Sequence, residues 1–130
     1  MKLKIWTIIF LVTLVAVACD QIDDACDEEK YGSALVSDFP DSLQAGVTHE
    51  LKVKYIIENS CGKFVEFETI ETPAQTEIKV KLMYEGCSCN LQFTEDSSYL
   101  SIKHDTAGLY LYKFYLSDGT YDTYQLNVFE

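Results

Sequence analysis

The sequence of 130 residues contains no arginine, so all ten of its basic residues are lysines. Against these stand 21 acidic residues, which gives a formal net charge of −11 at pH 7. Proteins that bind nucleic acids or phosphate groups depend on arginine side chains and basic patches. The composition therefore argues against a nucleic acid as a partner.

Catalytic motifs are also scarce. The sequence has no Gly-x-Ser-x-Gly turn, no His-Glu-x-x-His segment and no glycine-rich phosphate loop. It has two histidines, His49 and His104, and each stands beside a carboxylate. An active site requires several groups in a defined geometry, and two isolated histidines do not indicate one. We therefore expect no catalytic residue and no cofactor. A nucleophile that hydrogen-bonds to one histidine inside a pocket would instead indicate an enzyme.

The sequence lacks an apolar run long enough to span a bilayer, which takes about 18 residues or more. The longest run, from Ile5 to Ala18, has 14 residues and includes two threonines. Two lysines precede it and acidic residues follow it. This layout is typical of a secretory signal. We therefore expect residues 1–18 to be a cleaved signal peptide rather than a membrane anchor.

The end of this segment, Ala16-Val17-Ala18-Cys19, resembles the lipobox of bacterial lipoproteins. In that family the cysteine is acylated with palmitate and becomes the first residue of the mature chain. The resemblance implies a lipid anchor on Cys19, with the membrane as a partner. It also implies a place in the cell envelope at the outer membrane, facing the periplasm or the surface. Cleavage would remove two lysines and no acid, leaving 112 residues with a net charge of −13.

Residues 20–30 contain six acidic side chains. Such a segment repels itself into an extended, solvated form. We predict that residues 19–30 are a lipidated acidic tether and that residues 31–130 are one domain. An alternative is that these acids resemble the tag by which some Gram-negative lipoproteins are exported to the cell surface.

The rest of the sequence alternates between apolar and polar residues, as strands with one buried face do. Turn residues such as Asp118-Gly119 separate the alternating segments, and no segment has a helical period. We therefore predict an all-β fold, a sandwich of seven or eight antiparallel strands. The predicted strands are 51–57, 78–84, 110–116 and 124–128, with weaker ones at 34–37, 64–69, 91–94 and 99–102.

The segment 108–112, Gly-Leu-Tyr-Leu-Tyr, resembles the Gly-x-Tyr-x-Cys start of the sixth strand in immunoglobulin-like domains. The resemblance implies an immunoglobulin-like β-sandwich with Tyr110 as its corner tyrosine, whose hydroxyl bonds to nearby backbone. Tyr112 stands where those domains have a cysteine, and the only tryptophan, Trp6, lies in the signal segment. The resemblance thus concerns architecture and says little about function.

Residues 19–130 also resemble a group of small Gram-negative lipoproteins with an immunoglobulin-like domain. The resemblance rests on the segments 59–64, 84–89 and 107–110. It implies a fold and a location but brings no activity.

Four cysteines remain beside the lipid-bearing one, and an even number in an exported domain indicates disulfides. Cys87 and Cys89 are separated by one residue and are too close to bridge each other comfortably. We therefore expect Cys61 to pair with one of them and Cys26 with the other. The alternative is a metal site formed by three of these cysteines and a histidine, but structural zinc favours wider cysteine spacing.

Tyrosine is abundant, and five of the nine tyrosines lie within residues 110–124. Strand parity places Tyr110, Tyr112 and Tyr124 inward, whereas Tyr115 faces outward and Tyr121 follows a turn. Exposed tyrosines can stack on sugars or anchor a protein partner. Tyr115 and Tyr121 are therefore the candidate ligand-binding residues, and an exposed platform formed by both would favour a glycan ligand.

The sequence therefore predicts a lipid-anchored, non-catalytic binding or structural module of the cell envelope, with an envelope protein or a glycan as its partner. The alternatives are a glycan-binding accessory lipoprotein, a protease inhibitor of immunoglobulin-like fold, and an enzyme. A minor hypothesis concerns Ser42 and Thr106. Each stands in an Asp-Ser/Thr-apolar tripeptide that resembles a bacterial O-glycosylation site.

Overall fold

A computed structural model describes residues 26–130. The predicted signal peptide and the lipid attachment at Cys19 lie outside the described residues. Within them the chain forms eight strands: β1 (Glu28–Gly32), β2 (Ser42–Gln44), β3 (His49–Asn59), β4 (Gly62–Glu71), β5 (Thr76–Tyr84), β6 (Leu91–Ile102), β7 (Gly108–Tyr115) and β8 (Tyr121–Phe129).

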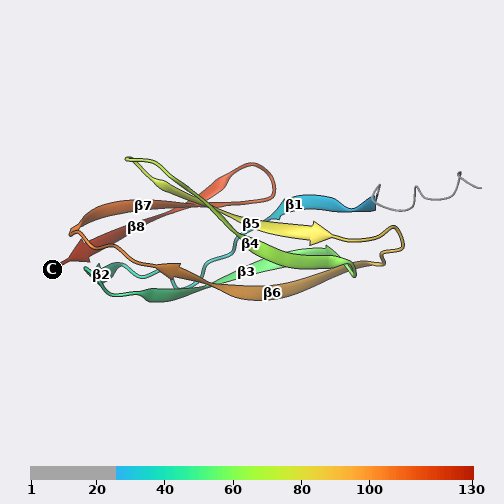
Figure 1. Cartoon of the computed structure of the whole chain (residues 1–130), viewed down its shortest axis with the longest axis horizontal. Coiled ribbons are helices and arrows are strands. Elements are labelled where there is room, and N and C mark those ends of the chain that lie inside the picture. The colour runs from blue at the N-terminus through green and yellow to red at the C-terminus, as the bar shows by residue number, and fades with distance from the viewer. Residues whose placement is uncertain (1–25) are drawn as a thin grey trace, which may run out of the picture.

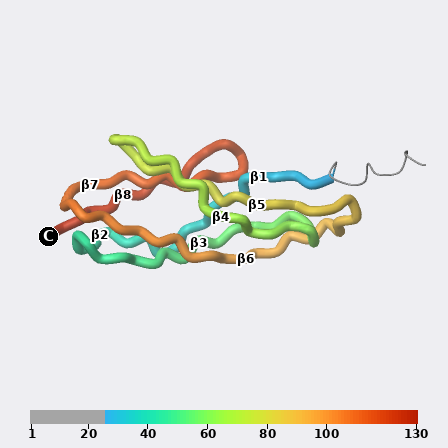
Figure 2. Tube along the Cα trace, in the orientation of Figure 1, coloured from blue at the N-terminus to red at the C-terminus, as the bar shows by residue number. Residues whose placement is uncertain are grey.

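The strands form two layers (Figure 1). One sheet has six strands, five of them in the order β1-β5-β7-β8-β2. β1 and β7 share one edge of β5, where β1 pairs with residues 80–84 and β7 with residues 76–78. The sixth strand, β4, pairs with the opposite edge of β5. The second sheet consists of β3 and β6 alone. The chain trace shows the second sheet running along the first for most of its length (Figure 2). The prediction of an all-β, immunoglobulin-like sandwich is therefore confirmed.

The core lies between the two sheets and follows from the alternation in the sequence. Alternate residues are buried from Leu51 to Tyr55 in β3 and from Ile78 to Tyr84 in β5, and the residues between them are exposed or half-buried. The same parity holds for the second half of β7 and the end of β8. The buried residues are Ala34, Leu51, Val53, Tyr55, Ile78, Val80, Leu82, Tyr84, Ile102, Tyr112, Phe114, Leu126 and Val128.

Two strand pairs are parallel, which corrects the prediction of a wholly antiparallel sandwich. β5 pairs with β7 in parallel, and so does β2 with β8. Between β5 and β7 the chain crosses to the second sheet as β6, so it returns to the first sheet in its original direction. Alternation of apolar residues sets which side chains are buried but does not encode this direction.

The strand β2 covers residues 42–44, where no strand was predicted, and strand boundaries differ from the prediction in several further places. The segments 91–94 and 99–102 belong to one strand, β6, because Glu95 and Asp96 keep pairing with β3 while remaining exposed. The predicted strand at 34–37 is reduced to a single bridge from Leu35 to Lys54. β1 begins at Glu28, inside the segment expected to be tether, since its acidic side chains stay in water while its backbone pairs with β5.

Candidate functional site

The four cysteines form two disulfides, Cys26–Cys87 and Cys61–Cys89, with Cα–Cα distances of 5.1 Å and 5.5 Å. Each member of the 87/89 pair thus takes one distant partner, as expected from their spacing. Because all four thiols are used in these bonds, they are not available as metal ligands. Within residues 26–130 no group of three or more His, Cys, Asp or Glu side chains is placed to hold a metal ion.

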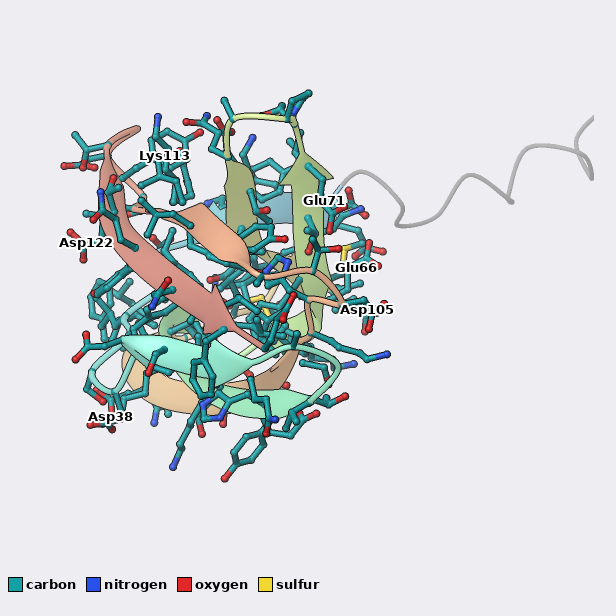
Figure 3. All side chains as sticks on the ribbon, turned by 90° about the vertical axis from the view of Figure 1, so that its left-hand side faces the viewer. Asp38, Glu66, Glu71, Asp105, Lys113 and Asp122 are labelled. Atoms are coloured by element: carbon teal, nitrogen blue, oxygen red, sulfur yellow. A yellow bond between two sulfur atoms is a disulfide. The ribbon has the colours of Figure 1, made fainter. Side chains whose placement is uncertain are left out.

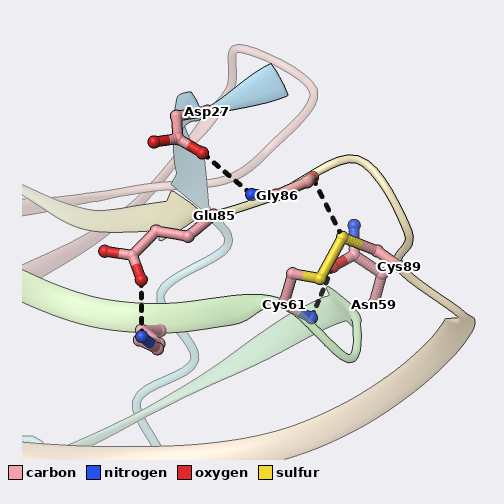
Figure 4. A network of polar contacts seen from close by, with 7 residues as sticks. Asp27, Asn59, Cys61, Glu85, Gly86 and Cys89 are labelled. Atoms are coloured by element: carbon pink, nitrogen blue, oxygen red, sulfur yellow. Dashed lines mark hydrogen bonds and ion pairs between the residues drawn. A yellow bond between two sulfur atoms is a disulfide. The ribbon is translucent and has the colours of Figure 1, made fainter. Parts of the chain in front are cut away.

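The surroundings of the Cys61–Cys89 bond are polar (Figure 4). The Cys61 amide donates a hydrogen bond of 2.9 Å to the side-chain oxygen of Asn59. The Gly86 amide donates one of 2.8 Å to the Asp27 carboxylate, beside the first strand. The disulfides and these bonds fasten the β5–β6 connection to the start of the domain and to the β3–β4 turn.

Three tyrosines, here called the tyrosine row, lie side by side on the outer face of the six-stranded sheet: Tyr31, Tyr115 and Tyr121. Tyr115 of β7 is directly opposite Tyr121 of β8, and their ring centres are 5.6 Å apart, edge to face. Tyr31 of β1 meets Tyr115 at 6.1 Å, also edge to face. The two tyrosines singled out from the sequence are therefore neighbours, and a third extends them.

Two lysines lie against the tyrosine row. The ammonium of Lys79 is 5.1 Å from the centre of the Tyr31 ring and 5.8 Å from that of Tyr115, so it lies near both rings. The ammonium of Lys113 is 5.9 Å from the Tyr121 ring centre. Distances of this size are within reach of cation–π attraction. These contacts fix the rings and place positive charge at the row.

Two carboxylates hold the tyrosine hydroxyls. Tyr31 donates a hydrogen bond of 2.6 Å to Glu68, and this bond, together with desolvation, raises the pKa of Tyr31. Tyr121 donates a longer bond of 3.4 Å to Glu77. The tyrosine row therefore combines aromatic surface with hydrogen-bonding groups of both charges. Tyr31 was not predicted, because it follows the acidic segment interpreted as a tether.

A second feature is a cleft of about 440 Å³ at one end of the sandwich, here called the end cleft. It opens between the β4–β5 turn, the connection from β6 to β7, and the start of β7. Figure 3 looks onto this end of the molecule, with Glu71 and Asp105 on the same side. The lining includes Glu71, Gln75, Ile78, Ile102, Lys103, His104, Asp105, Leu109, Tyr110, Leu111 and Tyr112.

His104 is the central polar residue of the end cleft. Its Nε2 atom is 2.7 Å from the Tyr112 hydroxyl, and its ring stacks on Tyr110 with 3.6 Å between ring centres. Burial lowers the pKa of His104, so the imidazole is neutral at pH 7. Burial, followed by the charge of Glu71, raises the pKa of Tyr112 to about 12. Tyr112 therefore remains a neutral hydroxyl, which is a poor nucleophile.

Tyr110 forms the corner expected from its motif, since its hydroxyl donates a hydrogen bond of 2.9 Å to the Thr106 carbonyl oxygen. Thr106 and Ser42, the suggested glycosylation acceptors, are both exposed. His49 lies half-buried at the start of β3, directly opposite the cleft-lining Ile102, but does not itself line the end cleft. The end cleft itself was not predicted, because three separate segments create it.

The chain matches no protein-family model, no curated protein and no solved structure. Residues 26–130 contain no helix that is long and apolar enough to cross a membrane. The two features that could carry a function are therefore the tyrosine row and the end cleft.

Proposed function

We propose that this protein is a non-catalytic binding module of the cell envelope, anchored to the outer membrane by lipid on Cys19, and that its tyrosine row binds carbohydrate. The observation that carries the proposal is the alignment of Tyr31, Tyr115 and Tyr121 on one sheet face, at ring spacings of 6.1 Å and 5.6 Å. The neighbouring rings are edge to face, at 73° and 72°, with Tyr31 exposed and Tyr115 and Tyr121 half-buried, so the row presents both edges and faces of aromatic rings.

The chemistry of the tyrosine row suits a sugar chain. Aromatic rings offer apolar surface to the C–H face of a sugar ring, and tyrosine adds a polar tip. Glu68 and Glu77 accept hydrogen bonds from the tyrosine hydroxyls, and the Lys79 ammonium lies over two of the rings. A sugar hydroxyl can replace a tyrosine hydroxyl as the hydrogen-bond donor to either carboxylate, so that no charged group is left without a partner. An open sheet face also suits an extended polymer better than a small compact ligand.

The two disulfides support the envelope location in the proposal. Disulfides persist in oxidising compartments outside the cytoplasm and are rare within it. Cys26 stands only seven residues after the proposed lipid-bearing Cys19, and its bond to Cys87 fixes the point where the folded domain begins. A lipid on Cys19 would thus hold the domain close to the membrane.

The test is affinity electrophoresis of the soluble domain, residues 20–130, in gels containing envelope and host-type polysaccharides. The domain should be retarded by at least one of them. Tyr115→Ala and Tyr121→Ala should each weaken retardation about tenfold, the loss typical of a central aromatic contact. Tyr99→Ala is the matched control, because Tyr99 is 63% exposed but lies on β6 in the other sheet.

Two outcomes contradict the proposal. One is migration unchanged by every polysaccharide tested. The other is equal loss in all three variants, which would indicate diffuse contact with tyrosines rather than a site. Thermal unfolding of each variant distinguishes loss of binding from loss of fold.

A further inference from the structure

The end cleft is a candidate site separate from the tyrosine row, because none of its lining residues belongs to the row. Its volume of about 440 Å³ lies within the range of small-ligand sites, about 300–1,000 Å³. A ligand in the end cleft would therefore bind independently of carbohydrate at the tyrosine row.

One wall of the end cleft is a strand edge. β7 pairs with β8 along its whole length, but its pairing with β5 begins only at Tyr112. The four residues Gly108–Leu111 therefore have no strand of residues 26–130 on their cleft side. In an antiparallel pair, every second residue directs its N–H and C=O away from the partner strand. These backbone groups can accept an extended peptide by strand addition.

The rim of the end cleft is acidic. Glu71 ends β4 and forms no ion pair within residues 26–130, whereas Asp105 pairs with Lys103 at 3.0 Å. The two carboxylates lie on the same side of this end of the molecule (Figure 3). The charge of Glu71 reaches both His104 and Tyr112 in the cleft. A ligand group that enters the end cleft therefore encounters the negative charge of Glu71 and the neutral side chains of His104 and Tyr112.

An aromatic surface accompanies this charge. The Tyr110 ring is half-buried and stacks on His104, so the cleft wall has two flat π-systems. A cation near a tyrosine face is attracted by the ring, and a carboxylate adds to that attraction.

From this arrangement we propose that the end cleft binds a lysine side chain carried by an extended peptide segment of another protein. The peptide backbone pairs with the free edge of β7 at Leu109–Leu111. The lysine ammonium lies between Glu71 and the Tyr110 ring. The formal net charge of the whole chain is −11 at pH 7, and this negative charge favours the approach of such a basic segment.

The experiment uses NMR on the isotope-labelled domain with a synthetic probe, an N-acetylated tripeptide amide of valine, lysine and valine. Because the chain has two histidines, their ring signals can be followed separately. The probe should shift the signals of His104 and of the Leu109–Leu111 amides, and it should shift His49 less, because His49 does not line the cleft. The same tripeptide with its lysine acetylated is the neutral control and should bind about tenfold more weakly.

Glu71→Gln should weaken binding of the lysine probe about three- to tenfold, the loss of one charge-assisted contact. Asp122→Asn is the matched control, because it removes the same charge from β8 opposite Phe114, toward the end of β7 that is away from the cleft. If Glu71→Gln does not fold, Asp105→Asn tests the same rim. The salt dependence of the wild-type titration gives a second measurement that needs no variant.

Three results would overturn the inference. The first is the absence of any shift at His104 with millimolar probe. The second is equal binding of the neutral control peptide. The third is equal loss from Glu71→Gln and Asp122→Asn, which would mean that the overall negative charge, and not the cleft, attracts the probe.

Discussion

The hydroxyl of Tyr110 donates a hydrogen bond of 2.9 Å to the carbonyl oxygen of Thr106, four residues earlier in the chain. This bond closes the corner through which the chain enters β7. It also fixes the ring that stacks on His104 and lines the end cleft. One local motif therefore shapes both the fold and a candidate site.

Tyr110→Phe should lower the free energy of unfolding by about 1 kcal/mol, since it removes one hydrogen bond and little apolar surface. Urea unfolding of the soluble domain measures this loss. Tyr99→Phe makes the same chemical change at a side chain that is 63% exposed and should have almost no effect. Equal destabilisation by both variants would show that the corner bond contributes nothing.

Thiol titration of the soluble domain should find no free thiol, and peptide mapping should link Cys26 to Cys87 and Cys61 to Cys89. Cys61 and Cys89 are 28 residues apart in the sequence. Replacing both by alanine should lower the free energy of unfolding by about 3.6 kcal/mol, according to the chain-entropy relation. Replacing Cys26 and Cys87, with a separation of 61, should cost about 4.3 kcal/mol.

A larger loss of unfolding free energy without the Cys61–Cys89 bond than without the Cys26–Cys87 bond would contradict the chain-entropy argument. Four titratable thiols in protein purified without reductant would contradict the disulfides themselves. Reduced and alkylated wild-type domain provides the reference for complete loss of both bonds.

Stability should fall with pH below about 6.5 because of His104. Burial lowers its pKa in the folded state, so the unfolded chain binds more protons in this range and unfolding is favoured as pH drops. Urea unfolding at pH 7.5 and pH 5.5 measures the difference. His104→Gln should reduce that difference, whereas His49→Gln, the matched control, should preserve it. A pH dependence unchanged in His104→Gln would remove His104 as its source.

The mature protein should begin at Cys19 and partition into detergent, as a lipid-anchored chain does. Cys19→Ala should leave an uncleaved precursor or release the protein from the membrane. Ser33→Ala is a control, because this serine is far from the lipobox sequence. Normal processing and membrane retention of Cys19→Ala would contradict the lipid anchor.

Features that depend on residues close together in the chain could be predicted from the amino-acid sequence. A period of two in β3 and β5 fixed which side chains are buried, because consecutive residues of a strand face opposite sides. The Gly-x-Tyr segment predicted the corner at Tyr110, since its hydrogen bond spans four residues. The close spacing of Cys87 and Cys89 indicated that each takes a distant partner.

Contacts between segments that are far apart in the chain became known only from the folded structure. In the fold, Cys26 is bonded to Cys87, and β5 and β7 are parallel. The ring centre of Tyr31 is 6.1 Å from that of Tyr115, which is 84 residues later in the chain. The fold also forms the end cleft from three separate segments. The physical reason is that local periodicity sets the direction of a side chain, whereas strand order depends on how whole apolar faces pack and where the connections cross.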